Sequence, residues 1–481
     1  MKRFFGMGLV VLTLALVAAQ CGAAVAEPAN DTSNQAGEET SIEEAAPEEE
    51  TALEEENIAE ASEEVVEEAV TESSEAVVEE KTTAAEEAAA ETEAVEEEAV
   101  AEVSAQEVTC DDPFADAGNL RFSPRSWTAE QIARFVTPGL VDPASGLETN
   151  FCMHSVDYAE ILSGGPPPDG IPPIDNPTFD SIATGDEWLA DVQPVISLAV
   201  GDEARAYPLA ILTRHEIVND EIAGIPVAVT FCPLCNTGVV YDREVNGEIL
   251  RFGVSGNLRN SDLVMWDNKT LSWWQQFTGE AIVGEMTGTQ LEIVPAQMVA
   301  WKDFKAAFPD GVVLSTNGRS YGQNPYVGYD SSSRPFLYAG TPDPRLPALE
   351  RVLGFTSGGT AVAYPMPVVA EAGVIEDNVA GQDVVIFYEP GQVSALDQGN
   401  IENSKEVGSA AMFVPIIDGQ KLTFSYDNGV ITDNETGSEW NIFGQATSGD
   451  LAGSQLEPLQ GRVDFWFAWT AFEPDTTLYG S

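Results

Sequence analysis

An internal repeat limits what the C-terminal part of this chain can fold into. Residues 206–224 align without gaps with residues 363–381, at an offset of 157 residues, and both stretches begin with Ala-Tyr-Pro and end with Ala-Gly. Self-similarity at a fixed distance is typical of duplicated structural units. We therefore interpret residues 194–316 and 351–481 as two degenerate repeats, joined by a connector loop at 317–350 that is rich in Gly, Pro and Tyr.

Short apolar runs between Gly, Asn and Asp turns indicate many strands and few helices. The expected strands are 195–200, 226–231, 384–387 and 422–426. A helix is expected to have Pro208 at its first position and to run through Leu212, and a second is expected over 299–308. This pattern predicts an α+β, strand-rich fold. Residues 108–193, which include a Gly/Pro-rich segment at 164–173, are expected to form a loop-rich N-terminal cap.

The first 26 residues have the pattern of a secretory signal peptide. Lys2 and Arg3 precede an apolar stretch from about Phe4 to Ala19, which is too short for a spanning helix. Cys21 follows a lipobox-like sequence, although Gln20 stands where such a box has a small residue. We predict an extracytoplasmic protein, secreted or anchored at the cell surface by lipid on Cys21 or by an uncleaved signal.

An acidic segment, residues 27–107, separates this signal from the rest of the chain. It contains 30 acidic residues and one basic residue, Lys81. Such a composition buries too little apolar surface to offset the entropy of ordering, so we predict a disordered tether.

The strong negative charge also limits the partners of the protein. The chain has a formal net charge of −59, of which −32 belongs to residues 108–481. A surface of this kind repels polyanions, so nucleic acid is excluded as a partner, and contact with a membrane is expected only through the N-terminus.

Four cysteines remain after Cys21. In an oxidising compartment, Cys110 and Cys152 are expected to form a structural disulfide. Cys232 and Cys235 form a Cys-x-x-Cys motif, for which several interpretations are open.

The repeat gives an internal control for this motif, because positions shared by both units are architectural and positions found in one unit need another reason. The Tyr-Pro pairs, Asp220 with Asp377, Gly224 with Gly381 and Trp274 with Trp440 are shared and are assigned to the scaffold. Four polar residues of the first unit have no chemical equivalent in the second: His215, Glu216, Cys232 and Cys235 align with Ala372, Gly373, Glu389 and Gln392.

Several motifs of the first unit and the connector resemble a known family. They are His215-Glu-Ile-Val-Asn-Asp220, Thr230-Phe-Cys-Pro-Leu-Cys235, Phe252-Gly-Val-Ser-Gly256, Asn260-Ser-Asp262 and Tyr321-Gly-Gln-Asn-Pro-Tyr326. Together they resemble the exported bacterial and archaeal proteins of domain-of-unknown-function family 3179, over roughly residues 170–370. The resemblance implies that this region is one module, and it implies no reaction.

The leading hypothesis for the site is a metal centre. Two thiolates two residues apart, with an imidazole, are typical ligands of zinc or copper, so His215, Cys232 and Cys235 are the predicted ligands. A fourth ligand is expected from Glu216, His154, Asp262 or water. The expected partner is an unidentified small molecule or a metal donor.

Other interpretations of the cysteine pair stay open. The cysteine pair could act as a thiol-disulfide oxidoreductase, with His215 lowering the pKa of one thiol. It could also be an inert disulfide or a pair of buried thiols in a structural or adhesive module. If the site is catalytic, Glu216, Arg259 and Asp262 are the candidate catalytic residues, with other polar side chains lining a pocket beside them: Ser261, Trp273, Gln275 and Gln276.

Overall fold

The structure is a computed structural model, and it describes residues 110–480. The predicted signal peptide at 1–26, the lipobox at Cys21 and the acidic tether at 27–107 lie outside the described residues. None of the helices within 110–480 has the length and the apolar character needed to cross a bilayer.

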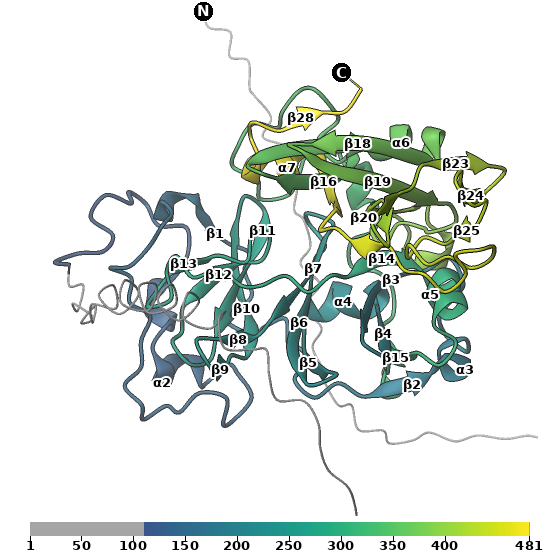
Figure 1. The fold of residues 1–481 in the computed structure, drawn as a ribbon. Helices are drawn as coiled ribbons and strands as arrows, with labels where there is room; N and C mark the ends of the chain where they lie inside the picture. Colours follow the sequence, from purple (N-terminus) through teal and green to yellow (C-terminus); the bar gives the residue numbers. More distant parts are fainter. Residues whose placement is uncertain (1–109, 481) are drawn as a thin grey trace, which may run out of the picture. The chain divides into compact units, whose positions relative to one another are not determined.

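The described part is strand-rich, with short helices between strands, as the sequence predicts (Figure 1). The N-terminal segment is mostly loop, and its few elements are η1 (Pro124–Ser126), α2 (Ala129–Ile132), η2 (Tyr158–Glu160), β1 (Ile161–Ser163), β2 (Phe179–Ser181) and α3 (Ile182–Gly185).

Residues 194–316 contain most of the strands that build the site. Their elements are β3 (Pro194–Val200), β4 (Glu203–Pro208), α4 (Leu209–His215), β5 (Ile217–Ile222), β6 (Ile225–Cys232), β7 (Thr237–Asp242), β8 (Glu244–Val245), β9 (Glu248–Ile249), β10 (Phe252–Arg259), β11 (Asp262–Asp267), β12 (Trp273–Gln275), β13 (Ala281–Val283), β14 (Gln297–Ala300), α5 (Trp301–Ala307) and β15 (Val312–Leu314).

Residues 317–480 begin with the connector, which is loop apart from η3 (Tyr329–Ser331). The elements after it are β16 (Arg351–Ser357), β17 (Thr360–Pro365), α6 (Met366–Ala372), β18 (Val374–Val379), β19 (Gln382–Glu389), η4 (Ile401–Asn403), β20 (Ser409–Val414), β21 (Ile416–Ile417), β22 (Gln420–Lys421), β23 (Phe424–Asp427), β24 (Val430–Asp433), β25 (Glu439–Trp440), β26 (Glu457–Pro458), β27 (Arg462–Phe465), α7 (Trp466–Phe472) and β28 (Thr477–Leu478).

The two segments that we interpret as repeats have the same order of strands in their first sheets. The sheet β14-β3-β4-β15 corresponds to β27-β16-β17-β28, and in each the last pair is parallel while the others are antiparallel. A second sheet follows in each segment, β5-β6-β7 in one and β18-β19-β20 in the other.

The polar residues assigned to the scaffold make the same bonds in both segments. The Tyr207 hydroxyl donates to Asp220 Oδ2 at 2.6 Å, and Tyr364 donates to Asp377 Oδ2 at 2.9 Å. Likewise Trp274 Nε1 donates to Asp267 Oδ2 at 2.9 Å, and its counterpart Trp440 donates to Asp433 Oδ2 at 3.0 Å. These hydrogen bonds are buried or half-buried, and losing one would leave a buried polar atom unpaired. This explains why the same residues occur in both segments.

Some predicted element boundaries were wrong. Val299 and Ala300 end strand β14, where Val299 pairs with Val195, so α5 begins at Trp301 and ends at Ala307. Pro208 ends β4 and caps α4 instead of occupying its first position. In both cases pairing with β3 extends a strand into residues whose apolar spacing suits a helix. The strand expected at 422–426 is β23, Phe424–Asp427.

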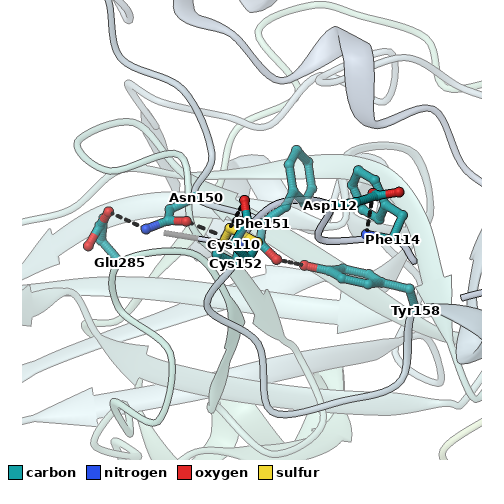
Figure 2. Close-up of a disulfide and its surroundings, with 8 residues drawn as sticks. All are labelled: Cys110, Asp112, Phe114, Asn150, Phe151, Cys152, Tyr158 and Glu285. Carbon is teal, nitrogen blue, oxygen red and sulfur yellow. Dashed lines mark hydrogen bonds between the residues drawn. A yellow bond between two sulfur atoms is a disulfide. The ribbon is translucent and has the colours of Figure 1, made fainter. Parts of the chain in front are cut away.

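The predicted disulfide between Cys110 and Cys152 is present (Figure 2). Beside it, Asn150 accepts a hydrogen bond from the Cys152 N–H at 3.1 Å and donates to Glu285 at 2.9 Å. Glu285 follows β13, so the disulfide loop is tied to the sheet of the first unit.

We predict that the Cys110→Ala/Cys152→Ala double variant is less stable by about 4 kcal/mol, because the disulfide closes a loop with a sequence separation of 42 residues. Denaturant unfolding of the oxidised wild type and the double variant measures the difference. Reduced wild type should match the double variant, and equal stability of all three would contradict a structural role for this bond.

Candidate functional site

Three buried side chains bring together donor atoms of the kinds that can bind a metal ion. The Sγ atoms of Cys232 and Cys235 and a carboxylate oxygen of Asp262 all lie within 4.8 Å of one another. Both cysteines are free thiols. The structure therefore joins the predicted cysteine pair to Asp262, which the sequence analysis named as a candidate fourth ligand and a candidate catalytic residue.

Two tight turns place these side chains. Cys232 is the last residue of β6 and pairs with Thr237 of β7, so Cys235 lies in the turn between them, where its N–H donates to Cys232 O at 3.2 Å. Asn236 has a φ of 55°, which lets the chain enter β7. The spacing of the Cys-x-x-Cys motif thus puts both thiols on one hairpin turn.

Asp262 comes from a neighbouring hairpin. Arg259 pairs with Asp262 across β10 and β11, which leaves a two-residue loop, Asn260 and Ser261, with φ values of 53° and 67°. Positive φ at both positions is what a type I′ hairpin turn requires. This turn brings Ser261 O to 3.9 Å from Cys232 Sγ, and Asp262 follows directly.

One oxygen of Asp262 is held by the protein and the other is not. Oδ2 accepts hydrogen bonds from Gln275 Nε2 at 2.7 Å and from the Phe277 N–H at 2.9 Å. Oδ1 is buried and accepts no hydrogen bond from an amide, hydroxyl or cationic group among residues 110–480, and the neighbouring thiol of Cys232 lowers the pKa of this carboxyl by hydrogen bonding. A buried carboxylate oxygen without a strong donor costs free energy, so this atom is a candidate for binding a ligand or an ion.

Glu216 is a second buried carboxyl beside the cluster. It follows the end of α4 with a φ of 58°, which turns the chain into β5. Burial, reinforced by the negative charge of Asp262, raises the pKa of Glu216 to about 8, although a hydrogen bond with Tyr326 opposes the shift. Burial also raises the pKa of Asp262 to about 7.

The thiols respond to burial in the same way. Burial raises the pKa of Cys232 and raises that of Cys235 well above its usual value, and the charge of Asp262 adds to both shifts. Reactive cysteines have lowered pKa values, because the thiolate is the nucleophile. In the absence of a cation these thiols stay protonated, which does not favour the oxidoreductase interpretation.

The second unit contacts this turn through β27. The Phe465 N–H donates to Cys235 O at 2.9 Å, and Thr237 Oγ1 donates to Asp464 Oδ1 at 2.7 Å. Arg462 forms an ion pair with Asp464 at 2.8 Å, and its charge also lowers the pKa of Asp262. The second unit therefore supports the turn that carries both thiols.

His215, a predicted ligand, lies outside the cluster of three. Its Nδ1 is 2.6 Å from Pro172 O, and its Nε2 faces Arg319 at 3.2 Å and Tyr321 at 3.3 Å. Burial lowers its pKa. Both ring nitrogens thus have protein partners in the N-terminal segment and the connector.

The other candidate residues either support Asp262 indirectly or have structural positions in turns and in the core. Arg259 pairs with Glu160 at 2.7 Å and reaches Asp262 only through Gln275, whose Oε1 is 3.5 Å from Arg259. The remaining three have structural positions, since Ser261 forms the hairpin turn, Trp273 is buried against Trp127, and Gln276 donates to Thr230. His154 is exposed and bonds Val156 O.

In the second unit, the position that aligns with Cys232 carries an acidic residue that is paired with a lysine. Glu389 aligns with Cys232, and Lys302 of the first unit forms an ion pair with it at 3.3 Å. A protein cation therefore balances the acid in the second unit, whereas among residues 110–480 no ion pair is formed by Asp262 or Glu216.

A cavity of about 420 Å³ adjoins the cluster on one side. Leu234, which lies between the two cysteines, and Leu263, which follows Asp262, both line it, as does Glu216. Connector residues Tyr326 and Tyr329 cover part of it, and the Tyr329 hydroxyl donates to Leu234 O at 2.9 Å.

Comparison with known families gives one match, the family described as protein of unknown function (DUF3179), over residues 168–476. The chain belongs to this family. No curated protein and no solved structure matches the sequence.

The DUF3179 match corrects the extent of the resemblance. The sequence motifs indicated a module of about residues 170–370, yet the family domain continues to residue 476 and so includes the second unit. The contacts of β27 with the cysteine turn give a physical reason, because the site region is incomplete without that strand.

Two residues of this DUF3179 site were missed in the sequence. Arg462 and Asp464 of β27 fall on Gln297 and Val299 when the two units are aligned. The sequence therefore contained a signal for these two residues, because charged side chains occur at these positions in the second unit and uncharged ones in the first.

The connector is held in place by a buried ion pair with the second unit. Asp330 Oδ2 is 3.2 Å from Arg351 and accepts a hydrogen bond from Ser394 at 2.5 Å, while Oδ1 is 3.3 Å from Lys405. Burial alone would raise the pKa of Asp330, but Arg351, Ser394 and Lys405 hold it below its usual value.

We predict that Asp330→Asn lowers the free energy of unfolding by about 3 kcal/mol, because Arg351 would remain buried without its counter-charge. The folded pKa of Asp330 is lowered, so its contribution is complete above the unfolded pKa of about 3.9 and is lost as the pH falls through the folded value. Denaturant unfolding at pH 7 and at lower pH should therefore show a difference that narrows in acid. Asp310→Asn, at an exposed position, is the matched control, and an equal loss in both variants would contradict the prediction.

Proposed function

We propose that this DUF3179 protein is an exported metalloprotein that binds one ion through Cys232, Cys235 and Asp262. The observation that carries the proposal is the cluster of two free, buried thiols and the fully buried Oδ1 of Asp262, which has no nitrogen or hydroxyl donor among the described residues and faces only these thiols. The residues fit a cation because all three donors become anionic on losing a proton, and burial penalises that charge unless a cation is present.

Zinc is the ion that this donor set fits best. Zinc accepts both cysteine sulfur and carboxylate oxygen, whereas Cu(I) prefers soft ligands alone. The carboxylate of Asp262 takes the place that the sequence hypothesis gave to the imidazole of His215. His215 instead holds the N-terminal segment and the connector against the end of α4.

The electrostatics of the two units support a cation at this place. Lys302 is a counter-charge to Glu389 of the second unit, the residue that aligns with Cys232. Beside the cluster of the first unit, the nearby cation Arg462 belongs to the second unit and is already paired with Asp464. A divalent ion would supply the missing positive charge.

Three protein ligands leave a coordination position open, as in catalytic zinc sites. Zinc bound there supplies Lewis-acid chemistry. Glu216 lines the adjacent cavity and, with a pKa of about 8, can hold or release a proton near neutral pH. Arg259 orients Gln275, which in turn holds Asp262 Oδ2.

The proposed location outside the cytoplasm has independent support in the disulfide between Cys110 and Cys152. Such bonds persist in oxidising compartments. Cys232 and Cys235 are buried, so they are shielded from the same oxidants.

We predict about one zinc ion per chain in protein purified under reducing conditions, measured by elemental analysis. Asp262→Asn and Cys232→Ser should each weaken zinc binding by more than about 100-fold, beyond the cost of losing an outer-shell group. His215→Ala should keep the ion.

Asp433→Asn is the matched control, because Asp433 is a fully buried aspartate of the second unit that is held by several donors. It should lose stability and keep zinc. Zinc-free wild type with two titratable thiols and a measurable two-electron potential would contradict the proposal and favour an oxidoreductase.

A further inference from the structure

The cavity beside the cysteine cluster has the size and walls of a small-molecule site. Its volume of about 420 Å³ is in the range of ligand pockets. Most of its wall is apolar, from the N-terminal segment, β10, β11 and the connector: Pro166, Ile171, Val254, Leu258, Leu263 and Leu337.

Two polar side chains stand out in this apolar wall. Glu216 is 7% exposed and Asn257 is 6% exposed. The side-chain amide of Asn257 makes no hydrogen bond to any residue in the described part of the chain, although an amide can make several. The amide has no protein partner within residues 110–480 and its atoms are open to the cavity, so a ligand with a complementary polar group can bond it there.

A β-bulge explains how Asn257 reaches the cavity. The register of β10 against β11 shifts between Val254 and Asn257. Gly256 within the bulge has a φ of 77°, and a Cβ there would meet Pro166 O at 2.0 Å. Bulges of this kind redirect side chains next to functional sites.

The rim of the cavity is unusually apolar for an exposed surface. Val327 and Phe336 of the connector both line the cavity, and they are 56% and 57% exposed. Exposed apolar side chains that gather around a cavity are typical of a binding site for an apolar molecule.

We propose that this cavity binds a neutral, mostly apolar organic molecule larger than one aromatic ring, with a hydroxyl or amide group that bonds Asn257 and Glu216. No lysine, arginine or histidine lines the cavity among the described residues, so an anion would find no counter-charge. An organic cation would lose its hydration against apolar walls. Leu234 and Leu263 place the bound molecule next to the cysteine cluster.

Only the role of this molecule as a substrate rests on the proposed metal centre. Binding itself depends on the cavity walls, so it can be measured with and without metal.

Four probes of similar shape test the proposal by isothermal titration calorimetry: p-cresol, toluene, 4-methylbenzoate and benzylammonium. We expect p-cresol to bind about 10-fold more tightly than toluene, the effect of roughly one hydrogen bond, and the two ions to bind most weakly. Asn257→Val should reduce p-cresol binding to the level of toluene. Tightest binding of either ion, or no binding of p-cresol, would overturn the proposal.

Phe336→Ser should weaken both neutral probes, whereas Phe135→Ser should not, because Phe135 is 48% exposed and does not line the cavity. Equal effects of the two substitutions would place the binding elsewhere and overturn the proposal. Binding of p-cresol to chelator-treated wild type separates the two hypotheses: it persists if the cavity is correctly assigned, whether or not zinc binds.

Discussion

The burial of four acidic side chains that form no ion pair with a protein cation within residues 110–480 is the constraint on which this site depends. Two thiols and two carboxyls lie at the ends of α4, β6 and β11, and burial raises the pKa of each. A fold has no structural need for such a cluster, since apolar side chains of similar volume would cost less. In our proposal a cation binds this cluster, because Oδ1 of Asp262 faces the two thiols and has no nitrogen or hydroxyl donor in the described part of the chain.

Both units contribute residues to the cluster or to the turn that carries it. The first unit supplies every donor atom, and the second supplies β27, which supports the cysteine turn through Phe465 and Asp464. The connector lies over the cavity and is fixed to the second unit through Asp330 and Arg351. Residues 351–480 therefore contact the cysteine turn, which agrees with a family domain that extends to residue 476.

The sequence predicted the strand-rich fold, the disulfide and the cysteine pair, because these depend on local spacing and on composition. The sequence alone could not show whether His215 or the adjacent Glu216 lies beside the cysteine cluster. The positive φ of Glu216 turns the chain at the end of α4, and His215 bonds Pro172, which is distant in the sequence. The start of α5 was misplaced because Val299 pairs with a strand far away in the chain. Contacts of this range leave no local pattern.

X-ray absorption at the zinc edge of the purified protein tests the central claim most directly, because it counts the ligands by element. Two sulfur atoms at about 2.3 Å and oxygen at about 2.0–2.2 Å are predicted from Cys232, Cys235 and Asp262. A spectrum with the scattering of an imidazole ring would instead assign His215 to the ion, and four sulfur atoms or none would contradict this centre altogether.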